Sequence, residues 1–273
     1  MSNPLTPEES LRDGDPRQAL TILQKQVRSR PDDAKLRIFL FQLLCVLGQW
    51  ERALNQLEVA STLDPAALAM AQTYREGIRC ELLRAQVFDG RKSPMVLGQP
   101  DTWLALLIES RLREGQGEGE AAEGLRQDAF EQAPETSGSV DGQCFKWIAD
   151  ADMRLGPVLE SVINGRYYWV PFSRLVRVVI EKPVDFRDAV WMPAHLKFDN
   201  GGDAVALIPT RYPGSESSED GLIALARKTT WLETKAGLCC GLGQRMLSTD
   251  AGEFALMDVR DLVFDVVEQE LAS

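Results

Sequence analysis

Two segments of one repeated pattern, GDPRQALTILQKQVRSRP at residues 14–31 and GQWERALNQLEVASTLDP at residues 48–65, decide the fold of this chain. They lie 34 residues apart and share a turn glycine, a small residue at the helix crossing, two leucines and a terminating proline. The matches are Gly14 with Gly48, Ala19 with Ala53, Leu20 with Leu54, Leu23 with Leu57 and Pro31 with Pro65. A period of this length is typical of tetratricopeptide-like helical hairpins. Such hairpins bury their apolar faces only against neighbours, which predicts a short helical stack.

The repeat continues in weaker form along the first half of the chain. Residues 33–47 are apolar around almost the whole helix, which predicts a buried central layer of the stack. A third copy follows a degenerate one, because Gly117, Ala122, Ala129 and Pro134 fall 69 residues after their counterparts in the second copy. Phe41 stands where such repeats usually carry a small residue, so it either packs in the core or projects into the groove.

The pattern changes after a polar hinge at residues 136–139. One helix is predicted between Leu155 and Gly165, and short β-rich runs are predicted at 167–170, 175–180, 189–198, 204–209, 229–234, 244–249 and 254–264. Residues 200–202 and 250–252 tolerate positive φ and should close hairpins. We therefore expect a tetratricopeptide-like helical repeat domain at 1–137, followed by a compact β-rich α+β domain, barrel-like in form, at 138–273.

The charge balance is acidic in both halves. The net charge is −11, with 16 basic and 21 acidic groups in residues 1–137 and 14 and 20 in the remainder. Neither half has the basic surplus that phosphate binding uses, so we expect no nucleic acid and no anionic membrane as partner. We find no apolar run of about 18 residues that could span a membrane and no secretory pattern at the start.

The cysteines indicate a reducing compartment. There are five, an odd number without metal-ligand spacing, which favours a cytoplasmic location. The adjacent Cys239 and Cys240 are either a redox-active pair or ordinary residues packed at the end of a strand.

The sequence offers little for catalysis. His195 is the only histidine, and no G-x-S-x-G motif is present, so we interpret His195 as structural. A zinc site needs about four nitrogen or sulfur ligands, and one histidine with scattered cysteines does not supply them. We therefore expect no catalytic residues, no cofactor and no bound metal.

Asp150 and Asp152 form the one cluster with an enzymatic character. Two carboxylates at this spacing lie on one face of an extended segment and could bind a divalent cation, as in a metal-dependent hydrolase. The alternative is a hydrogen-bonded network with arginines under the sheet, and we favour this structural role. The predicted members of the network are Asp150, Asp152, Arg154, Arg187, Asp188, Arg211 and Arg245.

Several long motifs of the second half match one family in order. They are FKWIADADMRLGPVLE at 145–160, GRYYWVPF at 165–172, RDAVWMPA at 187–194, IPTRYPGS at 208–215, ARKTTW at 226–231 and GQR at 243–245. In these motifs the chain resembles the ImpE/TagJ family of accessory proteins of bacterial type VI secretion. The resemblance covers nearly the whole chain, because that family also begins with a tetratricopeptide-like region.

The resemblance implies a cytoplasmic, non-catalytic adaptor. Such a protein would bind the small subunit of the contractile sheath, through the N-terminal helix of that subunit, and would influence handling of the sheath by the recycling AAA+ ATPase. The family gives no catalytic or partner-binding positions to carry over.

A stack of helical hairpins offers a groove for the apolar face of an amphipathic helix. Arg37, Phe41 and Trp103 are the candidate wall residues for partner binding. A general peptide-binding co-chaperone of the tetratricopeptide type, which would clamp a carboxylate terminus with basic side chains, is the other alternative. The acidic balance of the first half disfavours it.

Overall fold

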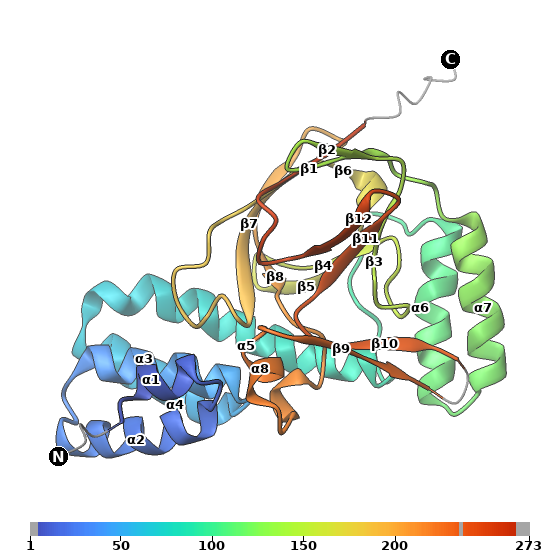
Figure 1. The fold of residues 1–273 in the computed structure, drawn as a ribbon. Coiled ribbons are helices and arrows are strands. Elements are labelled where there is room, and N and C mark those ends of the chain that lie inside the picture. The colour runs from blue at the N-terminus through green and yellow to red at the C-terminus, as the bar shows by residue number, and fades with distance from the viewer. Residues whose placement is uncertain (1–4, 235–236, 266–273) are drawn as a thin grey trace.

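The computed structural model describes residues 5–234 and 237–265. Its first part is helical, and Figure 1 shows α5 running from the α1–α4 stack at one end of the molecule toward the α6–α7 hairpin at the other. The helices are α1 (Pro7–Arg12), α2 (Pro16–Ser29), α3 (Ala34–Val46), α4 (Trp50–Leu63), α5 (Leu68–Phe88), α6 (Thr102–Gly115) and α7 (Gly119–Gln132). Within the described residues, no helix has both the length and the apolar character needed to cross a membrane.

The repeat pattern sets the turns of the helical stack. Gly14 and Gly48 join the paired helices with φ of 84° and 63°, which is why both copies carry glycine at this position. Asp15 and Asp33 cap the following helices, because their side chains accept hydrogen bonds from backbone N–H groups of the first turn. The predicted tetratricopeptide-like stack is therefore confirmed.

The second part is built mainly from strands, with the short helix α8 (Gly221–Ala224) beside them. The largest sheet is antiparallel, in the order β2-β1-β13-β6-β7-β8-β4-β5. A three-stranded sheet has the order β12-β11-β3, and β9 pairs with β10. The strands are β1 (Gly138–Val140), β2 (Gln143–Phe145), β3 (Ile148–Asp150), β4 (Val158–Ile163), β5 (Arg166–Pro171), β6 (Leu175–Ile180), β7 (Trp191–Phe198), β8 (Asp203–Pro209), β9 (Thr229–Glu233), β10 (Cys239–Gly243), β11 (Met246–Thr249), β12 (Gly252–Ala255) and β13 (Asp261–Phe264).

The prediction of a helix between Leu155 and Gly165 is wrong, because this segment contains strand β4. All six residues of β4 are buried, since the strand lies between β8 and β5 and is covered on both faces. A strand buried on both faces loses the alternation of apolar and polar residues and reads like a helix. Asn164 and Gly165, with φ of 49° and 71°, form the turn into β5 instead of ending a helix.

The prediction of a barrel-like form is also wrong, because the sheets are open. The described strands of the largest sheet end at β2 on one side and β5 on the other. Both predicted hairpins are confirmed: β7 turns into β8 at residues 199–202, and β11 turns into β12 at 250–251. The short strands β1, β2 and β3 and the strand β10 were not predicted, and the run at 254–264 is divided between β12 and β13.

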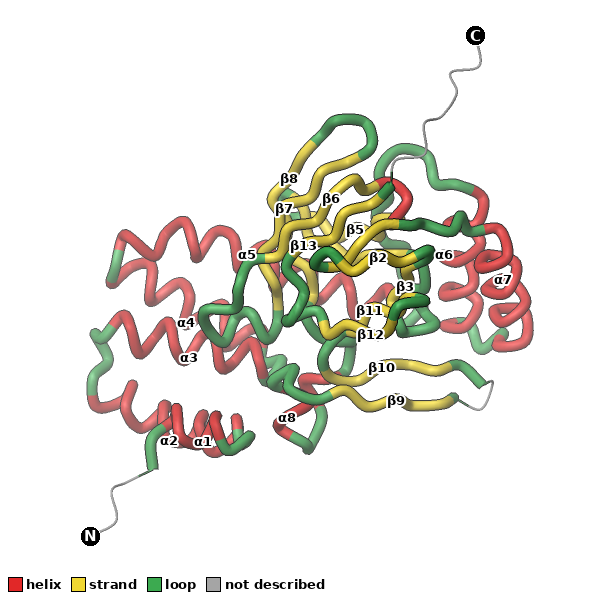
Figure 2. The backbone as a smooth tube through the Cα atoms, turned by 45° about the horizontal axis from the view of Figure 1, so that its top comes forward, coloured by secondary structure: helices red, strands yellow, loops and turns green. Residues whose placement is uncertain are grey.

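The apolar core crosses from the helices into the sheet. Phe39 of α3 stacks on Phe186 at a centroid distance of 5.7 Å, and Trp191 of β7 packs on Tyr74 and Trp50 at 5.6 and 6.1 Å. The same cluster of buried side chains contains residues on both sides of position 137. The two halves thus share a core, and Figure 2 shows the strands lying between the two groups of helices.

Arginines from elsewhere in the chain cap the carboxyl ends of three helices. Arg227 donates to the carbonyl of Leu11 at the end of α1 at 2.6 Å, and Arg211 donates to Val46 at the end of α3 at 2.6 Å. Arg111 of α6 donates to the carbonyl of Phe88 at the end of α5. A cation placed there donates to carbonyls of the last helical turn and complements the helix dipole. Two of these three arginines belong to the second half, so the stack is capped by the β-rich part.

Candidate functional site

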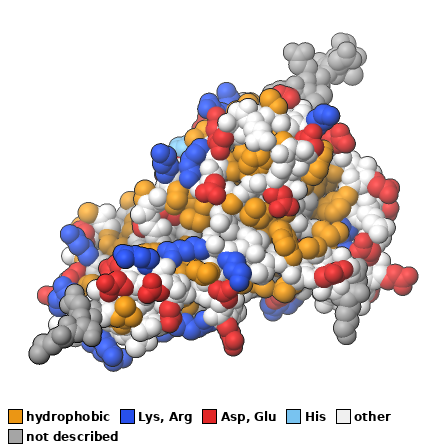
Figure 3. All heavy atoms as spheres, in the orientation of Figure 1, with side chains coloured by type: hydrophobic (Ala, Val, Ile, Leu, Met, Phe, Trp, Pro, Cys, Tyr) orange, Lys and Arg blue, Asp and Glu red, His pale blue; other side chains and the backbone are white. Residues whose placement is uncertain are grey.

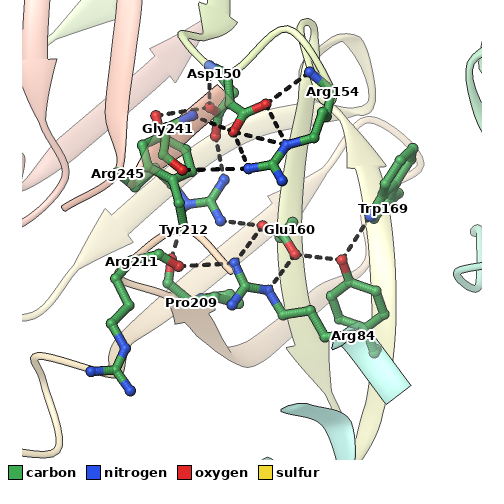
Figure 4. A network of polar contacts seen from close by, with 12 residues as sticks. Arg84, Asp150, Arg154, Glu160, Trp169, Pro209, Arg211, Tyr212, Gly241 and Arg245 are labelled. Atoms are coloured by element: carbon green, nitrogen blue, oxygen red, sulfur yellow. Dashed lines mark hydrogen bonds and ion pairs between the residues drawn. The ribbon is translucent and has the colours of Figure 1, made fainter. Parts of the chain in front are cut away.

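A buried carboxylate, Glu160 of β4, is the centre of a polar network between helix and sheet (Figure 4). Arg84 of α5 binds it with both sides of its guanidinium, from Nε to Oε1 at 2.6 Å and from Nη2 to Oε2 at 2.9 Å. Arg245 pairs with the same Oε2, and the Tyr167 hydroxyl donates to Oε1. Trp169 Nε1 donates in turn to the Tyr167 hydroxyl at 2.7 Å. Glu160 therefore forms ion pairs with two arginines at once.

Arg245 continues the network into the three-stranded sheet. It forms a second ion pair with Asp150 of β3, and its Nε donates to the carbonyl of Pro209 at 2.9 Å. The Tyr212 hydroxyl donates to Asp150 Oδ1 at 3.1 Å, and its ring lies 5.4 Å from the Arg245 guanidinium. The side chains of Arg245 and Asp150 are both fully buried.

Asp152 organises the adjacent loop. Its carboxylate accepts hydrogen bonds from the Arg154 side chain, from the Arg154 backbone N–H at 2.9 Å and from the Gly241 N–H at 2.8 Å. Gly241 has to be glycine, because a Cβ there would lie 2.2 Å from the Tyr212 ring. The Asp152 N–H donates to Asp150 Oδ1 at 2.9 Å, which ties the loop to the network.

The two carboxylates bound to Arg245 have opposite pKa shifts. Burial raises the pKa of Asp150 to about 6, although the Arg245 charge opposes this effect. Burial also opposes ionisation of Glu160, but the charges of Arg84 and Arg245 outweigh it and lower the pKa of Glu160 to about 2. Glu160 therefore stays charged at neutral pH, and its two arginines determine that state.

The network suits a structural role more than metal-dependent hydrolysis. Asp150 and Asp152 are 3% and 0% exposed, and their oxygens bond to arginines, a tyrosine hydroxyl and backbone N–H groups. A cation or a substrate would have to displace these partners. Within the described part of the chain, no group of three or more His, Cys, Asp or Glu side chains is placed to hold a metal ion.

Two residues predicted for the network, Arg187 and Asp188, lie outside it. Arg187 pairs with Asp185 and lies over the Tyr74 ring at 4.8 Å. Asp188 accepts hydrogen bonds from the backbone of its own loop. Arg211 joins the network through its backbone carbonyl, which accepts a hydrogen bond from Arg84 Nη2 at 2.9 Å, while its guanidinium caps α3 (Figure 4).

The prediction missed Glu160 and Arg84. The signal for Glu160 was a single acidic residue inside the apolar run VLESVI at 158–163. Arg84 lies on a long amphipathic helix and gave no comparable signal.

The candidate partner-binding residues are not grouped on one exposed surface. Phe41 is fully buried against Tyr74, and Trp103 is 4% exposed, so both are core residues. Arg37 is partly exposed on α3 and donates to Gln56 at 2.8 Å and to the Pro31 carbonyl. A role of Arg37 in partner binding stays a prediction.

The adjacent cysteines lie at the start of β10. Burial raises the pKa of both Cys239 and Cys240, which disfavours the reactive thiolate form. Both are free thiols.

A tetratricopeptide-like stack that shares its core with an open-sheet domain defines a helical-repeat scaffold, a class in which extended surfaces hold other polypeptides. Two family profiles match: Tetratricopeptide repeat at residues 10–73 and ImpE protein at residues 142–263. The type VI secretion system accessory component TagJ of Pseudomonas aeruginosa is 52% identical over 258 residues, which cover 94% of this chain and 90% of that protein. The chain therefore belongs to the ImpE/TagJ family of type VI secretion accessory proteins.

A solved structure supports the fold independently. The crystal structure of a Vibrio parahaemolyticus protein superposes with a TM-score of 0.87 and covers 96% of this chain and 98% of that one. The two sequences are only 24% identical, so this likeness concerns the fold alone.

Proposed function

We propose that this chain is a non-enzymatic, cytoplasmic adaptor that binds the small subunit of the contractile sheath through the N-terminal helix of that subunit. By holding this helix, the adaptor changes how the sheath is assembled or presented to the recycling AAA+ ATPase. The observation that carries the proposal is the 52% identity, over almost the whole chain, to a type VI secretion accessory component.

The architecture supports a binding role. Helical repeats present rigid surfaces to other polypeptides, and a helix laid in a groove is a common way to use them. The shared core and the buried pair of Arg84 with Glu160 hold the two halves in one arrangement. A rigid scaffold of this kind needs little ordering when a partner docks.

The metal-dependent hydrolase is the alternative that differs most in chemistry. It would need Asp150 and Asp152 to release their present partners, which are buried with them. Metal analysis of the purified chain separates the two functions. An equimolar divalent metal that is lost in the Asp150→Asn variant would favour the hydrolase.

The direct test is co-purification. We expect the tagged chain to retain the small sheath subunit when the two are expressed together, and to lose it when the first helix of the subunit is deleted. An Arg37→Ala variant tests the candidate wall residue in the same assay. Failure to retain the intact subunit would overturn the proposed function.

A further inference from the structure

An open groove lies between the carboxyl end of α7 and strand β3, with β9, β10 and β11 along it. We call it the α7–β3 groove. Its volume is about 630 Å³, in the range of sites that enclose several apolar groups. Figure 3 shows apolar side chains gathered over β11 and β12 and toward the α6–α7 hairpin. The apolar lining is formed mainly by Phe130, Pro134, Trp147, Met153, Pro157 and Trp231.

Two tryptophans distinguish this groove from the rest of the surface. Trp147 and Trp231 are 38% and 39% exposed, whereas Trp103 in α6 is 4% exposed. Trp231 is held in position, because its ring packs on Tyr212 at 5.8 Å and the Tyr212 hydroxyl bonds to Asp150. Tryptophan is among the residues that most often dominate binding energy at interfaces, and a fixed ring loses little freedom on binding.

The charged residues that line the groove are all acidic. Glu135 and Glu253 are exposed at its edge, and Asp150 lies buried beneath it. The described residues that line the groove include no Lys or Arg. An apolar surface bordered by carboxylates favours a partner whose apolar face is flanked by basic side chains.

The groove of the helical stack is already filled by the chain itself. Phe186 stacks on Phe39, and Trp191 packs against Tyr74 and Trp50. A partner helix could enter there only by displacing part of the shared core. The α7–β3 groove requires no such displacement, because its tryptophans are already exposed.

We propose that the α7–β3 groove is the docking surface for an amphipathic helix whose apolar face is bordered by lysine or arginine. The inference rests on the proposed function, which supplies a sheath helix as the partner. Apolar side chains at positions i, i+3 or i+4, and i+7 of that helix contact Trp147 and Trp231. Its basic side chains lie near Glu135 and Glu253.

The test is a titration of the full chain with two probes. One is the purified small sheath subunit, and the other is a synthetic leucine/lysine amphipathic peptide of about 18 residues, or five helical turns. The double variant Trp147→Ala/Trp231→Ala should bind both probes at least about tenfold more weakly. The double variant Glu135→Lys/Glu253→Lys should weaken both, most strongly at low salt. A leucine/glutamate peptide should bind much more weakly than the lysine form.

The controls separate this inference from the proposed function. Glu58→Lys, an exposed position on α4 in the other half, should leave both affinities unchanged. Circular dichroism checks the fold of the tryptophan variant, and the glutamate variant is an independent test because both of its positions are exposed. If the wild type binds the subunit and both groove variants bind it equally well, the groove is the wrong surface and the proposed function stands.

If the wild type does not bind the subunit at all, the proposed function fails. Binding of the synthetic peptide then tests by itself whether the groove is a docking surface. Binding of the leucine/lysine peptide that is lost in the tryptophan variant supports the groove, and unchanged or absent peptide binding overturns it.

Discussion

Arg84 and Glu160 form a two-point ion pair, with nitrogen–oxygen distances of 2.6 and 2.9 Å, although they are 76 residues apart in the chain. The pair joins α5 of the helical half to β4 of the sheet. Because Arg245 binds the same carboxylate, one glutamate fixes the position of two buried cations. The relative placement of the two halves depends on this contact as well as on the shared apolar core.

Replacing Glu160 with glutamine should destabilise the fold strongly. The change keeps the shape but removes the negative charge, and it leaves Arg84 buried with only Glu81 as a carboxylate partner. Breaking a buried ion pair by removing one partner costs about 3–5 kcal/mol. Urea unfolding at pH 7 measures this loss.

The exposed pair of Arg177 and Asp261 provides the matched control. Asp261→Asn should lower the free energy of unfolding by less than about 1 kcal/mol, because exposed pairs contribute little. Equal losses in the two variants would mean that the Glu160 network does not stabilise the contact between the halves.

Asp150 should make the stability of the protein depend on pH near 6. Its pKa in the folded protein, about 6, lies above the ordinary value of 3.8, so folding binds a proton between these values. The stabilisation from this group is complete below pH 3.8 and is lost as the pH rises through 6. Between pH 5 and 7 the wild type should lose about 1 kcal/mol relative to Asp150→Asn.

Glu160 should have the opposite effect at lower pH. Its pKa of about 2 lies below the ordinary 4.5, so its stabilisation is present above pH 4.5 and is lost as the pH falls toward 2. Urea unfolding of the wild type and Asp150→Asn at several pH values measures both effects. Parallel stability curves between pH 5 and 7 would show that Asp150 has no raised pKa.

Arg211 should stabilise the end of α3. Its buried guanidinium donates to the carbonyls of Cys45, Val46 and Ala224. Methionine would fill much of the same space but remove these three hydrogen bonds, and a hydrogen bond to a charged group contributes about 1.5–3 kcal/mol. We expect a loss of about 3 kcal/mol in Arg211→Met, together with faster proteolysis of α3. Arg177→Met, on the exposed surface, should change neither property.

The sequence was sufficient for the features that depend on local constraints. Gly14 and Gly48 need positive φ at the helix turns, so the repeat was visible as a fixed spacing. The hairpins at residues 200–202 and 250–252 were predictable for the same reason, because each turn contains a glycine with positive φ. These signals lie in a few neighbouring residues and do not depend on what packs against them.

The features that were missed depend on distant contacts. Strand β4 is covered on both faces by other parts of the chain, which removed its alternating pattern. The sequence left open whether Phe41 packs in the core or projects into the groove. In the structure Phe41 packs beside Tyr74, and Trp191 of the second half packs against the same tyrosine. Neither contact can be inferred from spacing in one segment.

The most direct test of this account is calorimetric titration of the wild-type chain with the purified small sheath subunit, in its intact form and without its N-terminal helix. We predict saturable binding of the intact subunit and no binding of the shortened one. Equal binding of both forms, or no binding of the intact subunit, would contradict the account.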